Sequence, residues 1–145
     1  MVPVVRAARR RIQRQHVVVC DGIDSCADRV VADWETDRVT DREAVVEPLR
    51  DCLESSGILT RLPLVLSDAV DATGYEMAAT PVSAPPYVVV TSRGPVLRAT
   101  IDPGRLVIRF DAFEVCSGSE FDSRSCSEPE YRRLENGLCL SVSLE

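Results

Sequence analysis

Apolar residues recur every three or four positions through the first quarter of the chain, which is the period of one face of an α-helix. This stripe consists of Val5, Ala8, Ile12, Val19, Ile23, Val30 and Trp34. Because its phase continues across Gly22, the pattern predicts one long helix over residues 4–36. The alternative is a break near Cys20–Ile23, where the glycine weakens the helix.

Two shorter amphipathic helices are predicted next along the chain. Thr40 and Glu43 have the spacing of a capping box, and the apolar positions that follow continue to a stop at Gly57. A third helix is predicted from about Thr60 to Gly74. Its apolar face would contain Leu62, Val65, Leu66, Ala69 and Val70.

After a connection that contains several prolines, the apolar period changes from 3.6 to 2, which indicates strands with one buried face. We expect strands at residues 87–92, 95–102, 105–115 and 138–145. A turn at Pro103-Gly104 would place Leu97 opposite Phe110 in an antiparallel pair. The polar segment over residues 117–136 is expected to be a loop with one helical turn at Glu128–Leu134.

These elements predict an α+β fold in which helices and strands are segregated along the chain. Three helices, the first one long, would occupy about residues 4–74 and pack on a four-stranded antiparallel sheet at about residues 86–145. A chain of 145 residues has the usual length of one domain with one core. We therefore treat residues 1–145 as a single domain.

Composition adds an unusual charge distribution. The net charge is −6, and all 17 basic residues are arginine. Residues 1–14 hold five of these arginines and no acidic residue, so the remainder of the chain is strongly acidic. An acidic surface without lysine stays hydrated in concentrated salt. In composition alone, and in no functional motif, the chain resembles small proteins of halophilic archaea, which implies a salt-adapted cytoplasm.

The N-terminal helix offers two modes of interaction. A helix of this length spans roughly 45–50 Å, so part of its apolar stripe would extend beyond so small a domain. We therefore expect self-association or another protein partner along that stripe. Alternatively, Arg6, Arg10 and Arg14 align on one helical face and would bind nucleic-acid phosphates, although weakly in concentrated salt.

A second candidate anion site follows from the expected strand register. In that register Arg98 lies opposite Arg109 on the outer face of the sheet. Like charges in direct opposition are unfavourable unless a carboxylate or a bound anion lies between them. Asp111 is the carboxylate expected in that role, and a bound anion or an acidic partner is the alternative.

Six cysteines are unusual for a chain without signs of secretion. They occupy positions 20, 26, 52, 116, 126 and 139, and no two of them have Cys-x-x-Cys spacing. We expect unlinked structural thiols and no metal site, with a Cys116–Cys126 disulfide across the polar loop as the alternative. A small redox or metal protein that uses the loop cysteines is therefore a further hypothesis.

No motif in the sequence points to catalysis or to a cofactor. The chain contains no glycine-rich phosphate loop and no nucleophile motif, and its one histidine, His16, has no metal-ligand spacing. It also has no apolar run long enough for a signal peptide or a membrane span. We expect a non-enzymatic interaction or structural protein of the cytoplasm, and the alternative is a nucleic-acid-associated accessory protein.

Overall fold

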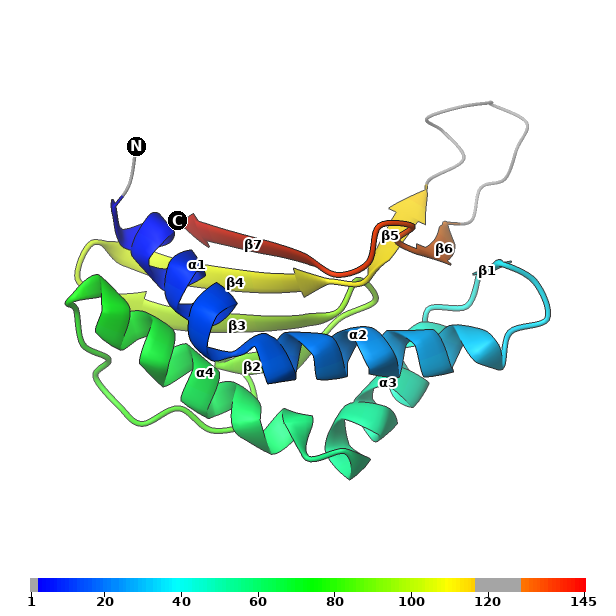
Figure 1. Ribbon diagram of the computed structural model, residues 1–145, viewed down its shortest axis with the longest axis horizontal. Coiled ribbons are helices and arrows are strands. Elements are labelled where there is room, and N and C mark those ends of the chain that lie inside the picture. The colour runs from blue at the N-terminus through cyan, green and yellow to red at the C-terminus, as the bar shows by residue number, and fades with distance from the viewer. Residues whose placement is uncertain (1–2, 117–128) are drawn as a thin grey trace.

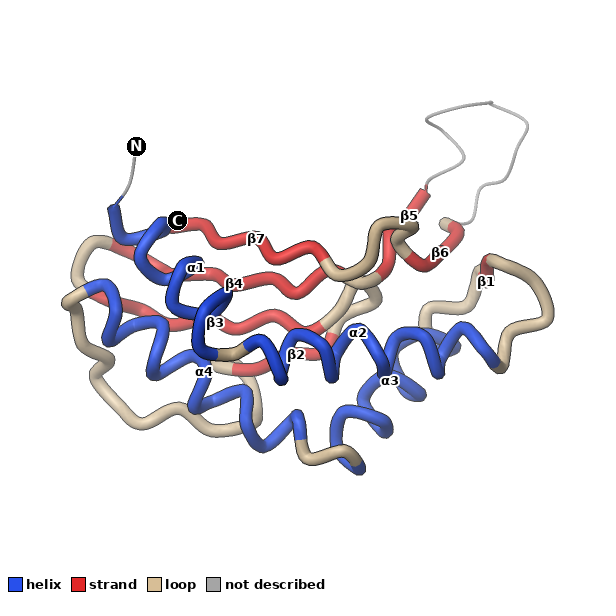
Figure 2. The backbone as a smooth tube through the Cα atoms, viewed as in Figure 1, coloured by secondary structure: helices blue, strands red, loops and turns tan. Residues whose placement is uncertain are grey.

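The structure, a computed structural model, describes residues 3–116 and 129–145. Helices precede strands along most of this range, which confirms the predicted α+β class (Figures 1 and 2). The helices are α1 (Pro3–Gln15), α2 (Val17–Ala32), α3 (Glu43–Ser55) and α4 (Ile58–Thr73). The strands are β1 (Arg38–Val39), β2 (Val88–Val90), β3 (Pro95–Ile101), β4 (Gly104–Asp111), β5 (Phe113–Cys116), β6 (Glu130–Arg133) and β7 (Cys139–Leu144). None of the helices in the described range is both long and apolar enough to cross a lipid bilayer.

The larger sheet has the antiparallel strand order β2-β3-β4-β7, and α1 and α4 pack on one of its faces (Figure 1). Alternate residues of β3 and β4 point toward these helices, as the period of 2 predicted. Leu97, Leu106, Ile108 and Phe110 are fully buried there. The predicted third helix is confirmed as α4, because its expected apolar face is the buried one.

The smaller sheet has the strand order β1-β6-β5 and lies beyond one end of the larger one (Figure 1). The chain passes from β4 to β5 at Ala112. Here the N–H groups of Ala112 and Phe113 donate to the carbonyl oxygen of Arg93 at 2.7 and 3.1 Å. Phe113 is fully buried, and its ring packs against Trp34 with 5.9 Å between the ring centroids. The segment that follows α2 therefore packs against the smaller sheet.

The prediction of one helix over residues 4–36 is wrong, and so is the alternative break near Cys20–Ile23. The chain leaves helical geometry at His16, which has φ −127° and ψ 35° and separates α1 from α2. His16 Nε2 pairs with Asp68 Oδ2 of α4 at 2.8 Å. A tertiary contact therefore coincides with the break, at a position where the apolar period shows no interruption.

Gly22, which suggested the alternative break, lies inside α2 and makes a packing contact. A Cβ atom at this position would clash with Ile58 Cδ1, at the start of α4. The missing side chain lets the two helices approach each other closely. This glycine therefore reflects helix packing and does not mark a helix end.

The start of α3 also differs from the predicted capping box. The backbone N–H of Glu43 donates to Asp41 Oδ1 at 3.0 Å, so Asp41 and not Thr40 satisfies the first turn. The predicted stop at Gly57 is confirmed. This residue has φ 83°, a conformation that favours glycine, and it separates α3 from α4.

The prediction of a single four-stranded sheet is only partly right. The strand expected over residues 105–115 is divided at Ala112 into β4 and β5, which belong to different sheets. The expected helical turn at Glu128–Leu134 is wrong, because Glu130–Arg133 form β6 between β5 and β1. Since β1 comes from the connection between α2 and α3, the two halves of the chain are not fully segregated.

The register between β3 and β4 differs from the prediction by two residues. Leu97 pairs with Ile108 and not with Phe110, because the chain turns at Asp102 and Pro103. A shift of two residues keeps every side chain on its predicted face. The predicted buried set is therefore right, whereas each predicted cross-strand neighbour in this pair is wrong.

Candidate anion-binding groove

Helix α1 places apolar and cationic residues on opposite faces. Ala8 and Ile12 are fully buried in the core, on the side where α1 packs against α4 and β7. Arg6, Arg10 and Arg14 are exposed, and their spacing of four residues aligns them along one face. Both alanine and arginine favour helices, so the segment is helical despite its charge density. The structure thus assembles the three arginines that the sequence singled out.

The apolar stripe that was expected to extend beyond the domain is buried inside it. Val19, Ile23 and Val30 of α2 are at most 4% exposed and belong to the same core as the buried residues of α1. The break at His16 divides the stripe between two shorter helices, and both fit against the rest of the chain. Self-association therefore stays a prediction, but this stripe does not supply its surface.

A groove of about 540 Å³ lies along α1 beside α4. It is lined by Pro3, Arg6, Ala7, Arg10, Arg11, Arg14, Gln15 and Ala72. Four guanidinium groups therefore come from one helix and border one concave surface. Within the part of the chain that the structure describes, no carboxylate forms an ion pair with Arg6, Arg10 or Arg14.

The fourth arginine of the groove, Arg11, is neutralised by Asp68 of α4. Arg11 Nη1 donates to Asp68 Oδ1 at 2.6 Å, while His16 pairs with Oδ2 of the same carboxylate. Burial alone would raise the pKa of Asp68, but the hydrogen bonds with His16 and Arg11 outweigh it and hold that pKa below its usual value. Asp68 is thus ionised at neutral pH and is already bonded to two partners. The remaining arginines of the groove are left for an external anion.

The position of these charges is unfavourable for α1 by itself. The first turn of α1 contains no acidic residue. The N-terminal end of a helix carries a partial positive charge, so a cation nearby costs about 0.3–1 kcal/mol. An anion bound in the groove would relieve both this cost and the repulsion among the guanidinium groups. The groove therefore has the charge and the shape of an anion-binding site.

The second predicted site lies on the outer face of the larger sheet. Its residues have other cross-strand neighbours than predicted, because the β3–β4 register differs by two residues. Arg98 lies opposite Val107, and Arg109 lies opposite Val96. The predicted direct opposition of Arg98 and Arg109 is therefore wrong. Arg109 instead lies 3.6 Å from the carboxylate of Glu145, which follows β7.

Asp111 does not bridge the two arginines as expected. Within the described ranges it forms no ion pair with either of them. Burial raises the pKa of Asp111, and the charges of Arg93 and Arg109 offset that rise only in part. The outer face therefore lacks the carboxylate bridge on which the prediction depended.

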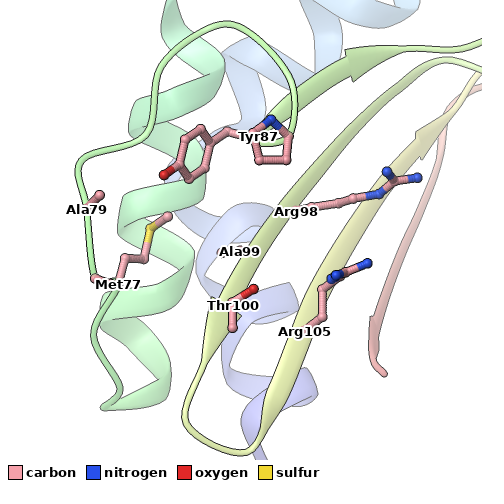
Figure 3. Close-up of a pocket in the computed structure, with 9 residues that line it drawn as sticks. Met77, Ala79, Tyr87, Arg98, Ala99, Thr100 and Arg105 are labelled. Atoms are coloured by element: carbon pink, nitrogen blue, oxygen red, sulfur yellow. The ribbon is translucent and has the colours of Figure 1, made fainter.

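A pocket of about 260 Å³ lies where residues 77–87 pass the edge of β3 (Figure 3). Met77 and Tyr87 line it from one side, and Arg98, Thr100 and Arg105 line it from the sheet. In Figure 3 both guanidinium groups extend away from Met77 and Tyr87. The cationic and apolar parts of this lining thus do not converge on one ligand position, which makes it a weaker candidate than the α1 groove.

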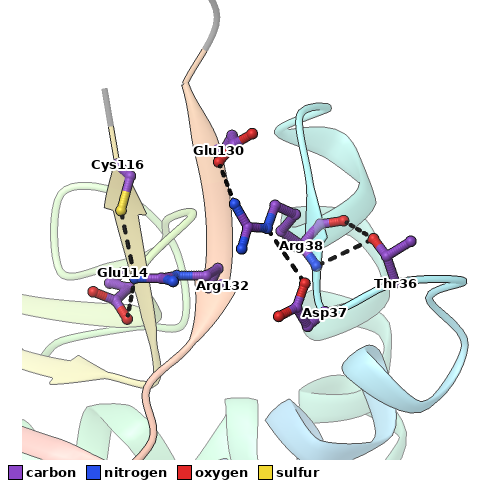
Figure 4. Close-up of polar contacts among 7 residues, drawn as sticks. All are labelled: Thr36, Asp37, Arg38, Glu114, Cys116, Glu130 and Arg132. Carbon is purple, nitrogen blue, oxygen red and sulfur yellow. Dashed lines mark hydrogen bonds and ion pairs between the residues drawn. The ribbon is translucent and has the colours of Figure 1, made fainter. Parts of the chain in front are cut away.

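Charged residues of the smaller sheet pair with one another (Figure 4). Arg38 of β1 donates to Glu130 of β6 at 3.1 Å, and Arg132 Nη2 lies 3.4 Å from Glu114 and 3.7 Å from Cys116 Sγ. Cys126, the predicted disulfide partner of Cys116, lies outside the described residues, so this prediction is not tested. Over the described ranges, no group of three His, Cys, Asp or Glu side chains is placed to hold a metal ion.

Sequence reasoning found three arginines of the groove and missed the Arg11–Asp68 pair. These two residues are 57 positions apart, and nothing in a single sequence links them. One signal was present, however. A helix rotates about 100° per residue, so Arg11 had to point away from the line of Arg6, Arg10 and Arg14.

In comparisons with known proteins, a family model matches the part of the chain that contains the arginines of the groove. A family model with the description "Domain of unknown function (DUF7988)" matches residues 6–145. The matched range includes all four arginines of the groove and all strands of both sheets. No curated protein and no solved structure has a significant match to the chain.

Proposed function

Because the chain belongs to the DUF7988 family, whose description assigns no activity, we propose from its geometry that it is a non-enzymatic protein that binds nucleic acid through the α1 groove. The observation that carries this proposal is the row of Arg6, Arg10 and Arg14 along one groove. These side chains have no carboxylate partner within the described residues. The proposal thus develops the accessory role that the sequence offered as its alternative.

The spacing of the arginines suits a phosphate backbone. Residues four apart on a helix are separated by about 6 Å along its axis, so the three free guanidinium groups form a linear row. Each guanidinium presents paired N–H donors that match the oxygens of a phosphate group. A linear chain of phosphates can contact such a row at several points, and base edges need not take part.

The acidic remainder of the chain favours a contact limited to α1. Residues 15–145 contain 12 arginines and 23 acidic residues, and these residues repel a polyanion as a whole. The charge distribution therefore favours the approach of nucleic acid at the α1 end. We expect binding without sequence preference, at a few phosphates, and with a strong dependence on salt.

The test compares two triple variants of equal charge. Arg6→Gln, Arg10→Gln and Arg14→Gln together remove the row. Arg50→Gln, Arg61→Gln and Arg105→Gln together remove three exposed arginines that lie outside the groove. Binding to a fluorescein-labelled DNA duplex is measured by anisotropy over a series of salt concentrations near 0.1 M.

The groove variant should lose about tenfold or more in affinity, and the slope of log K against log salt should become shallower by roughly 2–3 units. The matched variant should keep the slope of the natural chain. Equal losses in the two variants would show that only net charge matters and would refute the groove. Tighter binding to polyglutamate than to DNA at equal salt would instead indicate an acidic protein partner and refute the nucleic-acid assignment.

A further inference from the structure

Two cysteines that the sequence did not connect meet where α2 packs against α3. Cys26 Sγ lies 3.9 Å from Ser56 Oγ, and Arg29 Nη1 lies 3.9 Å from Cys52 Sγ. The earlier residue of α2 contacts Ser56, directly after α3, and the later one contacts Cys52 within α3, so the two helices are antiparallel here. Cys26 and Cys52 are therefore diagonal neighbours across one helix contact.

The two thiols have different access to solvent. Cys26 is 2% exposed and belongs to the core, whereas Cys52 is half-buried at the edge of that core. Burial, followed by the neighbouring Cys52 thiol, raises the pKa of Cys26 to about 11. Cys26 thus stays protonated at neutral pH. The Cys52 sulfur lies beside the Arg29 guanidinium, at 3.9 Å from its Nη1.

We propose that Cys26 and Cys52 form a redox-active thiol pair that a peroxide oxidises to a disulfide between α2 and α3. This proposal is independent of the α1 groove, because none of the residues that line the groove takes part. It also differs from the redox hypothesis for the loop cysteines, since its two cysteines lie on neighbouring helices that pack against each other.

The oxidation proceeds in two balanced steps. The Cys52 thiolate attacks one peroxide oxygen and the O–O bond breaks, which leaves a sulfenic acid on Cys52 and, with one proton, releases water or an alcohol. The Cys26 sulfur then attacks the Cys52 sulfur, an S–S bond forms and the S–O bond breaks. The departing hydroxide takes the proton of the Cys26 thiol and leaves as water. Both thiols together lose two electrons, and the peroxide gains them.

The closed disulfide would add a covalent link between α2 and α3, which are otherwise joined by side-chain packing and weak contacts to sulfur. The covalent loop would run from Cys26 to Cys52 and would include Trp34 and strand β1. Reduction by a dithiol would reopen it. The pair would thus make the attachment of the smaller sheet sensitive to the redox state of the surroundings.

The test uses the full chain, reduced, freed of reductant, treated with hydrogen peroxide and then alkylated. Because every basic residue is arginine, trypsin places Cys20 and Cys26 on peptide 15–29 and Cys52 on peptide 51–61. We expect these two peptides to appear as one species that is lighter by two hydrogen atoms than their sum. Addition of a dithiol should separate them again.

Cys20→Ser is the matched control, because it changes the other cysteine of the same peptide. It should keep the linked species, whereas Cys26→Ser should lose it. Cys26→Ala and Cys52→Ser serve as second variants in case a buried serine hinders folding. The proposal is overturned if Cys20→Ser abolishes the link. It is also overturned if Cys52 is oxidised to its sulfinic acid while Cys26 remains open to alkylation after unfolding.

Discussion

Arg10 and Arg11 are adjacent in the sequence and have different roles because helix rotation separates their directions. Arg11 turns toward α4 and pairs with Asp68, whereas Arg10 stays on the exposed side of the groove. In strand β6 the alternation of side chains between two faces has a similar result, because Arg132 and Arg133 have different partners. At the scale of single residues, the partner of each charged side chain thus depends on the direction in which it points from its helix or strand. Composition alone does not reveal it.

Replacement of Asp111 with asparagine should stabilise the fold at neutral pH. The pKa of Asp111 is raised in the folded state by burial, so folding opposes its ionisation. Stability is therefore lost as pH rises from the unfolded pKa, about 3.9, through the folded pKa. Since the side chain is only half-buried, the gain of Asp111→Asn at pH 7 should be small, about 0.5 kcal/mol. Urea unfolding at pH 7 and near pH 3.5 measures it, and the gain should vanish at the lower pH.

Asp51→Asn, on the exposed face of α3, is the control for this measurement. It should leave the free energy of unfolding nearly unchanged at both pH values. A loss of stability in Asp111→Asn at pH 7 would show that the charges of Arg93 and Arg109 dominate over burial at this carboxylate.

At the scale of elements, periodicity predicted which faces are buried but not how the elements divide. All the residues of the N-terminal stripe from Ala8 to Val30 are buried, as the period predicted. The helix is nevertheless interrupted at His16, which pairs with Asp68, a residue 52 positions further along the chain. The β3–β4 register behaves in the same way, since a slip by two residues leaves the pattern of period 2 unchanged. Strand β1 has two residues and β6 is largely polar, so neither carries a period that could be recognised.

For the candidate groove, too, sequence predicted what lies within one element and not what depends on contacts between elements. Arg6, Arg10 and Arg14 could be placed on one face from sequence because they lie on one helix, where spacing fixes direction. The pairing of Arg11, the rearrangement around Arg98 and the meeting of Cys26 with Cys52 each depend on contacts between separate elements. Such contacts require the tertiary arrangement, which no local pattern encodes.

Arg133 connects β6 to α2, so its loss should detach these elements. Its guanidinium donates to the carbonyl oxygens of Ala112 and Asp24 at 2.9 and 3.2 Å, and it pairs with the carboxylates of Asp24 and Asp28. Its side chain is 16% exposed. Arg133→Ala should lower the free energy of unfolding by about 2–3 kcal/mol, because several charged hydrogen bonds are lost together. Urea unfolding at pH 7 measures this loss.

The neighbouring Arg132 is the matched control. Its side chain is 35% exposed and lies 3.4 Å from Glu114. Arg132→Ala should therefore cost less than about 1 kcal/mol. Equal losses in the two variants would indicate that β6 depends on its backbone pairing and not on the contacts of Arg133.

At the scale of the whole molecule, the fold has two unequal parts. The larger sheet contains the longest strands, β3, β4 and β7, and α1 and α4 pack on it. The smaller sheet consists of strands with two, four and four residues. It is attached through Ala112, through Arg133 and through the packing of Trp34 against Phe113. Local stability falls where few apolar contacts are made, so we expect the smaller sheet to open before the rest.

The position of Trp34 makes this opening visible in a simple optical experiment. It is the one tryptophan of the chain and it packs on Phe113 of β5, so intrinsic fluorescence reports on the end of the molecule that carries the smaller sheet. Far-ultraviolet circular dichroism reports mainly on the helices. In a urea titration the fluorescence midpoint should precede the dichroism midpoint, because local opening exposes the indole while α1 and α4 remain folded. Coincident curves would mean that both sheets unfold as one cooperative unit. Trp34 thus serves as a built-in probe of one part of the fold, and its signal must not be taken for the stability of the whole.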